Sequence, residues 1–299
     1  MESVKKEMSV KGSAMILVTG ATGNNGIELI QRLSSIGAPV RGMVHRKREG
    51  ADVAWPGVEF VTADFDDPES LRRAFDGVDR AFLVTNSSES AEARQLRFVE
   101  LARAAGVHHI VYLSQLHAAA DSPVRFLWYH AVVEEAIRSS GMMFTNLRPN
   151  LYMQGLLTFR RSIASEGRFF APIGGARVSL VDVRDIAAVA AAALTGSGHH
   201  GRTYDLTGPD ALTHAEMASQ LSKALGTSIN FVDMPEQAMR EALVGFGMLE
   251  WQADGVIEDY AHYRRGEAST VSSAFRDVTG DPPHSFAAFA RDYRPAFLA

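Results

Sequence analysis

The sequence predicts an α/β fold: a doubly wound parallel sheet of the Rossmann type, followed by a smaller, mainly helical C-terminal lobe. Two observations carry this prediction. From Ala14 to about Pro149, short apolar runs alternate with longer segments of helical spacing, which is typical of parallel strands joined by crossover helices. After Leu147 the pattern changes, and residues 159–172 and 212–299 carry large apolar residues at helix-like spacing.

Six runs are expected to form the strands of this sheet. They are Ala14–Val18, Val40–Val44, Val58–Val61, Arg80–Val84, His109–Leu113 and Phe144–Leu147. Most of them are nearly all apolar, as strands covered on both faces should be. A strand-like run at Arg202–Leu206 is expected to extend the sheet.

The helices between the strands have recognisable ends. Asp67 before Pro68 predicts a helix N-terminus. Helices at 91–105 and 129–140 are expected to end before Gly106 and Gly141.

Two further patterns are explained structurally. Thr213 to Glu216 reads as a capping box that opens a helix through Ala224. The run Asp182 to Asp185 predicts a helix cap with a bracing ion pair rather than an acid–base pair.

We predict two folding units and a leader. Residues 14–155 and about 175–207 form the dinucleotide-binding part, and about 156–174 and 208–299 form the substrate or cap lobe. Residues 1–13 lack the apolar core of a signal peptide, so we expect a flexible leader and a cytoplasmic protein. No apolar run is long enough to span a bilayer.

Composition excludes several classes of site. The 299 residues include no cysteine, so disulfides, thiolate metal sites and thiol nucleophiles are ruled out. A formal net charge of −5 argues against a general basic surface for nucleic acid. The ten histidines show no metal-ligand spacing, so we predict no metal.

The motif that points to chemistry follows the first strand. The run 19–26 reads TGATGNNG, with Gly20, Gly23 and Gly26 ahead of a helical segment. Glycines at these positions permit a sharp turn, a close backbone approach to a pyrophosphate and tight helix packing. We therefore predict a dinucleotide site; the alternative is a turn needed only for packing.

The end of the second strand indicates which dinucleotide. Arg46 lies twenty residues after Gly26, where an arginine accommodates a 2′-phosphate and an acidic residue would hold a ribose hydroxyl. NADP(H) is thus favoured over NAD(H). The alternative is a solvated basic loop, with Glu49 close by.

Polar clusters follow two later strands, Thr85, Asn86 and Ser87 after the fourth and Ser114 with Gln115 after the fifth. Ligands lie beyond the carboxyl ends of strands in such sheets, so both clusters are expected to face the cofactor. Turn chemistry alone would also explain their polarity.

Several phrases together resemble the NmrA-like branch of the atypical short-chain dehydrogenases/reductases, most of all its bacterial NADPH quinone reductase and triphenylmethane reductase type. The phrases are TGATGNNG, VRGMVHR at 40–46, TADFDD at 62–67, His130-xxx-Glu134, Ser140-Gly141 and Leu147-Arg148-Pro149-Asn150. The resemblance spans about residues 15–207, with a fainter echo at 286–293.

The resemblance implies roles for individual residues. Thr22, Asn24 and Asn25 would contact phosphate and ribose, Arg46 the 2′-phosphate, Asp64 and Phe65 the adenine, and Pro149 with Asn150 would belong to the cofactor site. Asp64 has an alternative reading as a loop carboxylate that makes local backbone hydrogen bonds.

The chain departs from ordinary short-chain dehydrogenases at the catalytic position. Aligned on Glu134, His130 stands at the usual lysine and Phe126 at the usual tyrosine, while Tyr129 is followed four residues later by Val133. His130 would donate a hydrogen bond to the nicotinamide ribose and, with a near-neutral pKa, deliver a proton, its tautomer fixed by Glu134. The alternative is a half-buried packing histidine.

Two functions remain open on the sequence. The first is an NADPH-dependent reductase that passes hydride to a quinone or similar flat, electron-poor acceptor, a small molecule bound against Tyr152, Phe169, Phe170 and Trp251. These aromatic residues have an alternative reading as core. The second is a non-catalytic regulator that senses NADP(H) and acts through a protein partner. The oligomeric state is not indicated.

Overall fold

The computed structural model describes residues 14–45 and 55–298, and a seven-stranded sheet lies at its centre. The strands run in the order β3-β2-β1-β4-β5-β6-β9, and every neighbouring pair is parallel. They are β1 (Met15–Val18), β2 (Val40–Val44), β3 (Val58–Thr62), β4 (Val78–Leu83), β5 (His109–Leu113), β6 (Met143–Pro149) and β9 (Arg202–Leu206). The order reverses between β1 and β4, so the predicted doubly wound sheet is confirmed.

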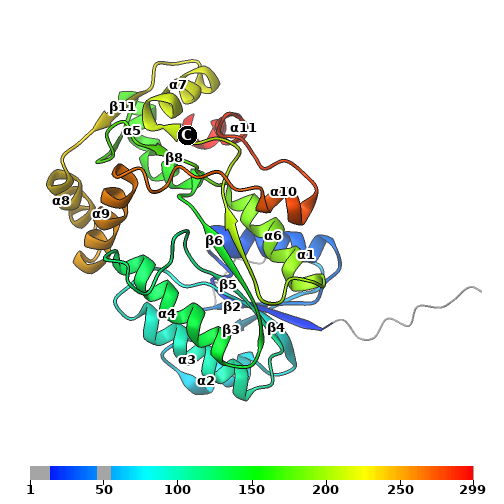
Figure 1. The fold of residues 1–299 in the computed structure, drawn as a ribbon. Coiled ribbons are helices and arrows are strands. Elements are labelled where there is room, and N and C mark those ends of the chain that lie inside the picture. The colour runs from blue at the N-terminus through cyan, green and yellow to red at the C-terminus, as the bar shows by residue number, and fades with distance from the viewer. Residues whose placement is uncertain (1–13, 46–54, 299) are drawn as a thin grey trace, which may run out of the picture.

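Helices cover both faces of the sheet (Figure 1). One face carries α1 (Asn24–Ser35), α6 (Val183–Thr195) and α10 (Ala274–Thr279), and the other carries α2 (Pro68–Ala74), α3 (Ala91–Ala104) and α4 (Arg125–Ser139). Ile30 and Ile186 are fully buried on the first face, and Phe98 and Val133 on the second. Burial on both sides explains the apolar strands, whereas β3 at the edge leaves Phe60 45% exposed.

Local signals set most helix ends as predicted. The Asp67 carboxylate accepts hydrogen bonds from the N–H groups of Glu69 and Ser70 at the start of α2, and Gly106 and Gly141 take positive φ after α3 and α4. The start of α4 differs, since it begins at Arg125 rather than at Tyr129. The reason is a distant partner: Glu258 Oε2 accepts from the Arg125 N–H at 2.9 Å. No local pattern reveals such a cap.

The segments after β6 that do not belong to the sheet or cover it form a C-terminal lobe, with a third apolar cluster around Phe169, Leu221 and Phe289. Its helices are η1 (Met153–Phe159, a 3₁₀ helix), α5 (Arg160–Glu166), α7 (His214–Leu225), α8 (Glu236–Gly245), α9 (Glu250–Arg264), α11 (Phe286–Asp292) and α12 (Arg294–Leu298). The predicted capping box of α7 is present. The predicted division into two units stays a prediction; Met153 and Val178, both assigned to the first unit, pack in this cluster.

Two short strand pairs interrupt the helices of this lobe. β7 (Arg168–Ala171) pairs in parallel with β11 (Asn230–Asp233), and β8 (Arg177–Val178) pairs antiparallel with β10 (Leu212–Thr213). The helix-like reading of 159–172 is therefore wrong for its last part. Side chains alternate between buried and less buried along β7, which is the period of a strand.

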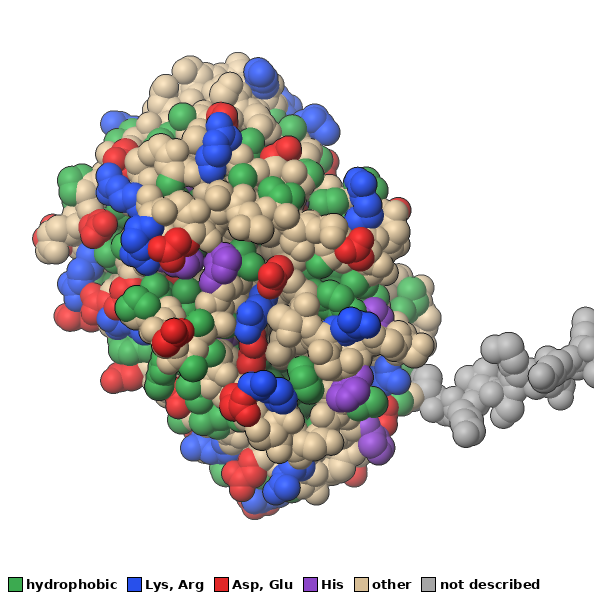
Figure 2. All heavy atoms as spheres, viewed as in Figure 1, with side chains coloured by type: hydrophobic (Ala, Val, Ile, Leu, Met, Phe, Trp, Pro, Cys, Tyr) green, Lys and Arg blue, Asp and Glu red, His purple; other side chains and the backbone are tan. Residues whose placement is uncertain are grey.

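The surface bears charges of both signs. On the face shown in Figure 2, Lys and Arg side chains lie interspersed with Asp and Glu. Within residues 14–45 and 55–298, none of the helices has the length and apolar character that a bilayer crossing requires.

Helix α9 joins the C-terminal lobe to the sheet through its contact with α4. A Cβ added to Gly255 would lie 2.4 Å from the Phe126 ring, so only glycine allows this approach. Trp251 packs on the same ring with centroids 5.6 Å apart. Arg125 forms an ion pair with Glu258 at 2.6 Å. Apolar contact and ion pair together fix α9 beside the carboxyl ends of the strands.

The Gly255 contact makes a prediction about stability. Gly255→Leu should lower the free energy of unfolding by about 1–3 kcal/mol, because the added side chain overpacks Phe126. Gly245→Leu is the matched control, since a Cβ there meets nothing within 4 Å and the helix gains propensity. Urea unfolding of both variants checks this. Equal stabilities would contradict the close contact.

Candidate functional site

The glycine turn connects β1 to α1, and each glycine has a different physical role. Gly20 has φ +60°, a conformation that favours glycine. A Cβ on Gly26 would lie 2.1 Å from the Gly20 carbonyl oxygen, so Gly26 allows the helix to start against the turn. Gly23 has ordinary extended geometry, and its nearest neighbour would be 3.4 Å from a Cβ. The fold therefore does not itself require glycine at position 23.

The start of α1 fits the pyrophosphate of a dinucleotide. Gly23 is the N-cap residue, and no side chain caps the helix. The first N–H groups of an uncapped helix, together with its dipole, attract an anion. The Oδ1 atom of Asn25 is buried and has no hydrogen-bond partner within the described part of the chain. Both features are those of a turn that holds a ligand.

The residues predicted to bind the cofactor gather at the carboxyl edge of the sheet. Arg46 lies outside the described residues. Of the others, Thr22, Asn24 and Asn86 are exposed, and Asn25, Asp64, Phe65, Thr85, Ser87 and Gln115 are half-buried. The edge also includes the buried residues Ser114, His130, Pro149 and Asn150.

Two of these residues have structural partners that account for them. Asn150 donates hydrogen bonds to Ser179 Oγ and the Ala268 carbonyl and accepts one from the Leu151 N–H. Its amide is thus used to hold β6 against the C-terminal lobe. Asp64 Oδ1 accepts from the Asp66 N–H at 2.9 Å, which is the local bonding expected of a loop carboxylate.

A buried chain of hydrogen bonds leads from His130 to the end of β4. The Tyr112 hydroxyl donates to Gln95 Oε1 at 2.6 Å, and Gln95 Nε2 donates to Thr85 Oγ1 at 2.5 Å. Since the hydroxyl proton of Tyr112 is used, the contact of 2.6 Å to His130 Nδ1 is donated by His130. The neutral imidazole therefore carries its proton on Nδ1 and presents Nε2 as an acceptor.

Three expectations for His130 are wrong. Burial, followed by the charge of Arg148, lowers the pKa of His130 to about 3, so the ring stays neutral near pH 7 and is no proton source. Glu134 does not fix its tautomer, because both carboxylate oxygens of Glu134 bind Arg148, at 2.8 and 2.6 Å. With Nδ1–H given to Tyr112, His130 can accept a hydrogen bond from a ribose hydroxyl but not donate one.

Tyr129 lies beside this chain but is bonded elsewhere. Its hydroxyl lies 3.2 Å from Ser87 Oγ, and burial raises its pKa to about 12. Ser114 donates to Glu134 Oε1 at 2.5 Å. The side-chain hydroxyls of Ser87 and Ser114 are therefore both engaged within the protein.

A cavity of about 1110 Å³ opens in the C-terminal lobe. Its wall is mainly aromatic and methionine-rich and includes Tyr152, Phe159, Phe169, Phe170, His214, Met217, Met234, Met239, Phe246, Met248 and Tyr260. Tyr152 bridges the two sites, since it lines the cavity and lies close enough to Asn25 for the amide to affect its pKa. A flat apolar molecule in this cavity would therefore approach the turn.

The cavity agrees with part of the predicted aromatic wall. Tyr152, Phe169 and Phe170 line it, but Trp251 does not. On α9 the side chains of Gln252, Val256 and Tyr260 face the cavity, and position 251 faces α4 instead.

Sequence reasoning missed two polar residues here. His214 is 3% exposed in the cavity wall, its Nδ1 has no partner in the described chain, and burial lowers its pKa to about 4. The sequence analysis assigns His214 to a capping box, so it gives no reason to expect this residue in a cavity wall. Asp259 on α9 accepts from Gln115 Nε2 at 3.0 and 3.1 Å. It has no sequence signal, because only folding brings α9 to the end of β5.

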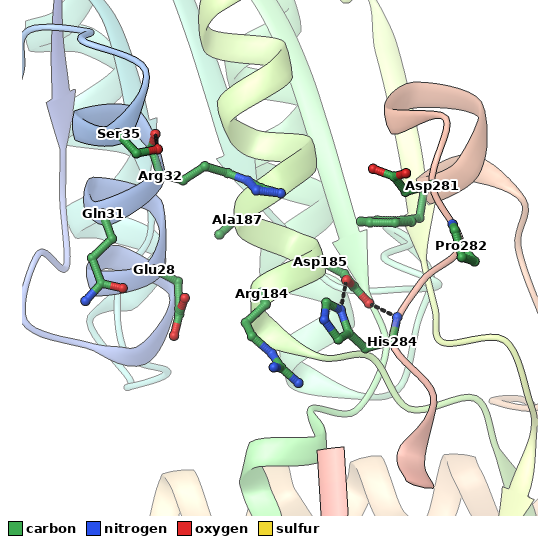
Figure 3. Close-up of a pocket in the computed structure, with 11 residues that line it drawn as sticks. Glu28, Gln31, Arg32, Ser35, Arg184, Asp185, Ala187, Asp281, Pro282 and His284 are labelled. Atoms are coloured by element: carbon green, nitrogen blue, oxygen red, sulfur yellow. Dashed lines mark hydrogen bonds and ion pairs between the residues drawn. The ribbon is translucent and has the colours of Figure 1, made fainter. Parts of the chain in front are cut away.

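A second, polar pocket of about 640 Å³ lies between α1, α6 and residues 281–284 (Figure 3). There His284 Nδ1 contacts the buried Asp185 at 2.5 Å. At the start of α6, Asp182 accepts from the Arg184 N–H at 2.9 Å and pairs with its guanidinium, so the predicted cap with ion pair is confirmed. These contacts brace α6.

Known proteins resemble this chain over nearly its whole length. It is 36% identical over 289 residues to the NAD(P)H azoreductase of Xenophilus azovorans, covering 95% of this chain and 100% of that protein. It is 38% identical over 287 residues to the (4-alkanoyl-5-oxo-2,5-dihydrofuran-3-yl)methyl phosphate reductase of Streptomyces griseus, covering 95% and 99%.

Its fold matches that of a solved reductase. The NADPH-dependent quinone oxidoreductase of Escherichia coli, solved in complex with NADPH, superposes with a TM-score of 0.82 at 26% identity, covering 93% of this chain and 99% of that one. The model of the NmrA-like family matches residues 12–265. The chain therefore belongs to the NmrA-like family, as its motifs predicted.

Proposed function

We propose that this protein is an NADPH-dependent oxidoreductase that transfers hydride to a quinone or a similar flat, electron-poor small molecule. The observation that carries the proposal is the position of the acceptor-sized cavity, whose wall residue Tyr152 lies next to Asn25 of the glycine turn. The relatives at 36% and 38% identity are both named reductases. Cofactor turn and acceptor cavity would thus act as one site.

The protein's own residues bind and orient the reactants. When bound, NADPH supplies the hydride, and the N-terminus of α1 with Gly23 and Asn25 would hold its phosphates. His130 would accept a hydrogen bond from the ribose. The apolar wall excludes water and holds the acceptor in line with the cofactor, which is the main demand of a direct transfer.

The same cavity supports the choice of acceptor. Four methionines, at positions 217, 234, 239 and 248, line it together with aromatic rings. Methionine side chains adapt to irregular apolar shapes and contact aromatic rings favourably. A multi-ring molecule fits this wall better than a small polar carbonyl compound.

The alternative function is an NADP(H)-sensing regulator of NmrA type that acts through a protein partner. It would need the same turn but not an apolar cavity beside it. The names of the relatives favour turnover. A cytoplasmic location stays a prediction from the sequence.

The first test concerns cofactor choice. NADPH should bind at least tenfold tighter than NADH, a difference of about 1.4 kcal/mol, because Arg46 would face the 2′-phosphate. Arg46→Ala should weaken NADPH binding and leave NADH binding unchanged, so the difference between the two affinities should become smaller. Fluorescence titration measures both. Equal affinities in the unmodified protein would refute the NADP preference.

The second test separates the roles of two glycines. Gly23→Val should abolish NADPH binding in a folded protein. A Cβ at Gly23 meets no atom closer than 3.4 Å, so the fold tolerates it, but the side chain would block the close approach of the pyrophosphate expected at this turn. Gly26→Val should instead destabilise the fold, since its Cβ meets the Gly20 carbonyl. Calorimetry with circular dichroism distinguishes them. A folded Gly23→Val protein that still binds NADPH would place the dinucleotide elsewhere.

The third test decides between enzyme and regulator. NADPH absorbance should fall in the presence of quinones or dyes. His130→Ala should reduce turnover about tenfold or less, because it removes a hydrogen-bond acceptor for the ribose and no proton donor. The factor should be the same from about pH 5 to 8, because His130 stays neutral there. Tyr129→Phe should keep activity. Tight NADPH binding with no oxidation above the buffer rate would instead support the regulator.

A further inference from the structure

Asp259 is a carboxylate for which the packing of α9 gives no structural reason. Its neighbour Glu258 pairs with Arg125, and Asp254 pairs with Arg240 at 2.5 Å. Asp259 has no cation partner in the part of the chain that the structure describes. Its one hydrogen-bond partner there is the Gln115 amide. A half-buried carboxylate without a counter-ion costs stability, which suggests a functional role.

The location of Asp259 is the junction of the two sites. Gln115 lies directly after β5 at the carboxyl edge of the sheet, where a dinucleotide binds. On α9, Val256 and Tyr260 line the acceptor cavity, one turn before and one residue after Asp259. Asp259 itself is not among the lining residues. Its carboxyl group binds Gln115 at the edge that would hold the nicotinamide, on the helix that forms one wall of the cavity.

The surroundings of Asp259 favour its neutral form. Burial raises the pKa of Asp259 to about 7, the Gln115 hydrogen bond opposes the rise, and the charge of Glu258 adds to it. Tyr129 from α4 and Tyr260 from α9 also lie within electrostatic reach.

Within residues 14–45 and 55–298, the only side chain that bonds the Asp259 carboxyl group is Gln115. Tyr263 lies on the next turn of α9. Burial and, to a smaller extent, the charge of Asp259 raise its pKa. His117, on the loop after Gln115, packs edge-on against His262, 5.6 Å between ring centroids. A carboxyl group in this setting is half protonated near neutral pH, as a general acid should be.

We propose that Asp259 donates the proton that completes reduction of the acceptor, a role that rests on the proposed reductase function. With an azo acceptor, one nitrogen gains the hydride that NADPH gives up. The other nitrogen takes the proton of the Asp259 carboxyl group. The N=N double bond becomes an N–N single bond with one hydrogen on each nitrogen, NADP⁺ is formed, and Asp259 is left as a carboxylate. Water then returns its proton.

The chemistry of acceptors gives this proposal a sharp test. An azo compound needs hydride and a proton, whereas a cationic triarylmethane dye needs hydride alone and becomes neutral without any proton. A proton donor therefore matters for the first acceptor only. A residue that merely supports the fold or the cofactor would matter equally for both.

The experiment compares Asp259→Asn with the unmodified protein on a neutral azo dye and on a cationic triarylmethane dye, with NADPH. The variant should lose at least 10²-fold in kcat on the azo dye, the lower end for a lost general acid, and less than threefold on the triarylmethane dye. NADPH affinity should be unchanged. Asp254→Asn, on the same helix, is the control and should leave the ratio of the two rates unchanged.

The pH profile provides a second readout. With the azo dye, kcat of the unmodified protein should fall as pH rises through about 7, because the donor must be protonated. Asp259→Asn should lack this fall. Equal losses on both dyes, or no loss on the azo dye, would overturn the role of Asp259 while leaving the reductase intact. An unmodified protein that oxidises NADPH with neither dye, nor with quinones, would overturn both.

Discussion

The close approach of α1 to the turn after β1 is the constraint on which the rest of the site depends. Because Gly26 has no side chain, the helix begins directly against the Gly20 carbonyl, and no side chain of the N-cap residue occupies its N-terminus. The same approach sets Asn25 beside Tyr152. From there the acceptor cavity extends into the C-terminal lobe. A methyl group at position 26 would push these parts away from one another.

A second contact determines how the cavity meets the sheet. Helix α9 is held on α4 by Gly255 against Phe126 and by Arg125 with Glu258. One face of this helix therefore packs on α4 beside the sheet, and the neighbouring face lines the cavity. Under the proposed function, the cofactor edge and the acceptor wall would share this helix, so the packing that holds α9 on α4 would also position an acceptor.

The sequence predicted most of the fold, because its signals are local. Each of these signals affects residues that are close in sequence. They are the apolar runs of the strands, the Asp67 cap and the glycines after α3 and α4. The glycine turn was found for the same reason. The start of α4 was not, since its cap comes from Glu258, 133 residues away.

The chemistry of the site was harder to predict. His130 and Glu134 are four residues apart on a helix, which indicates a pair, yet Tyr112 and Arg148 from the neighbouring strands take their hydrogen bonds. Burial also lowers the pKa of His130, so the imidazole stays neutral and lacks the second proton that the sequence-based prediction assigns to it. Asp259 can be recognised as a candidate site residue only in the folded structure, where α9 lies at the end of β5. Tertiary partners, rather than spacing, decide these roles.

The central claim is that the turn and the cavity form one continuous site. A crystal structure with NADP⁺ and a slowly reacting azo or quinone acceptor tests it most directly. The pyrophosphate should lie at the start of α1, and the acceptor should lie in the cavity with its reacting atom roughly 3–3.5 Å from C4 of the nicotinamide. An acceptor bound outside the cavity, or a nicotinamide directed away from it, would contradict the account.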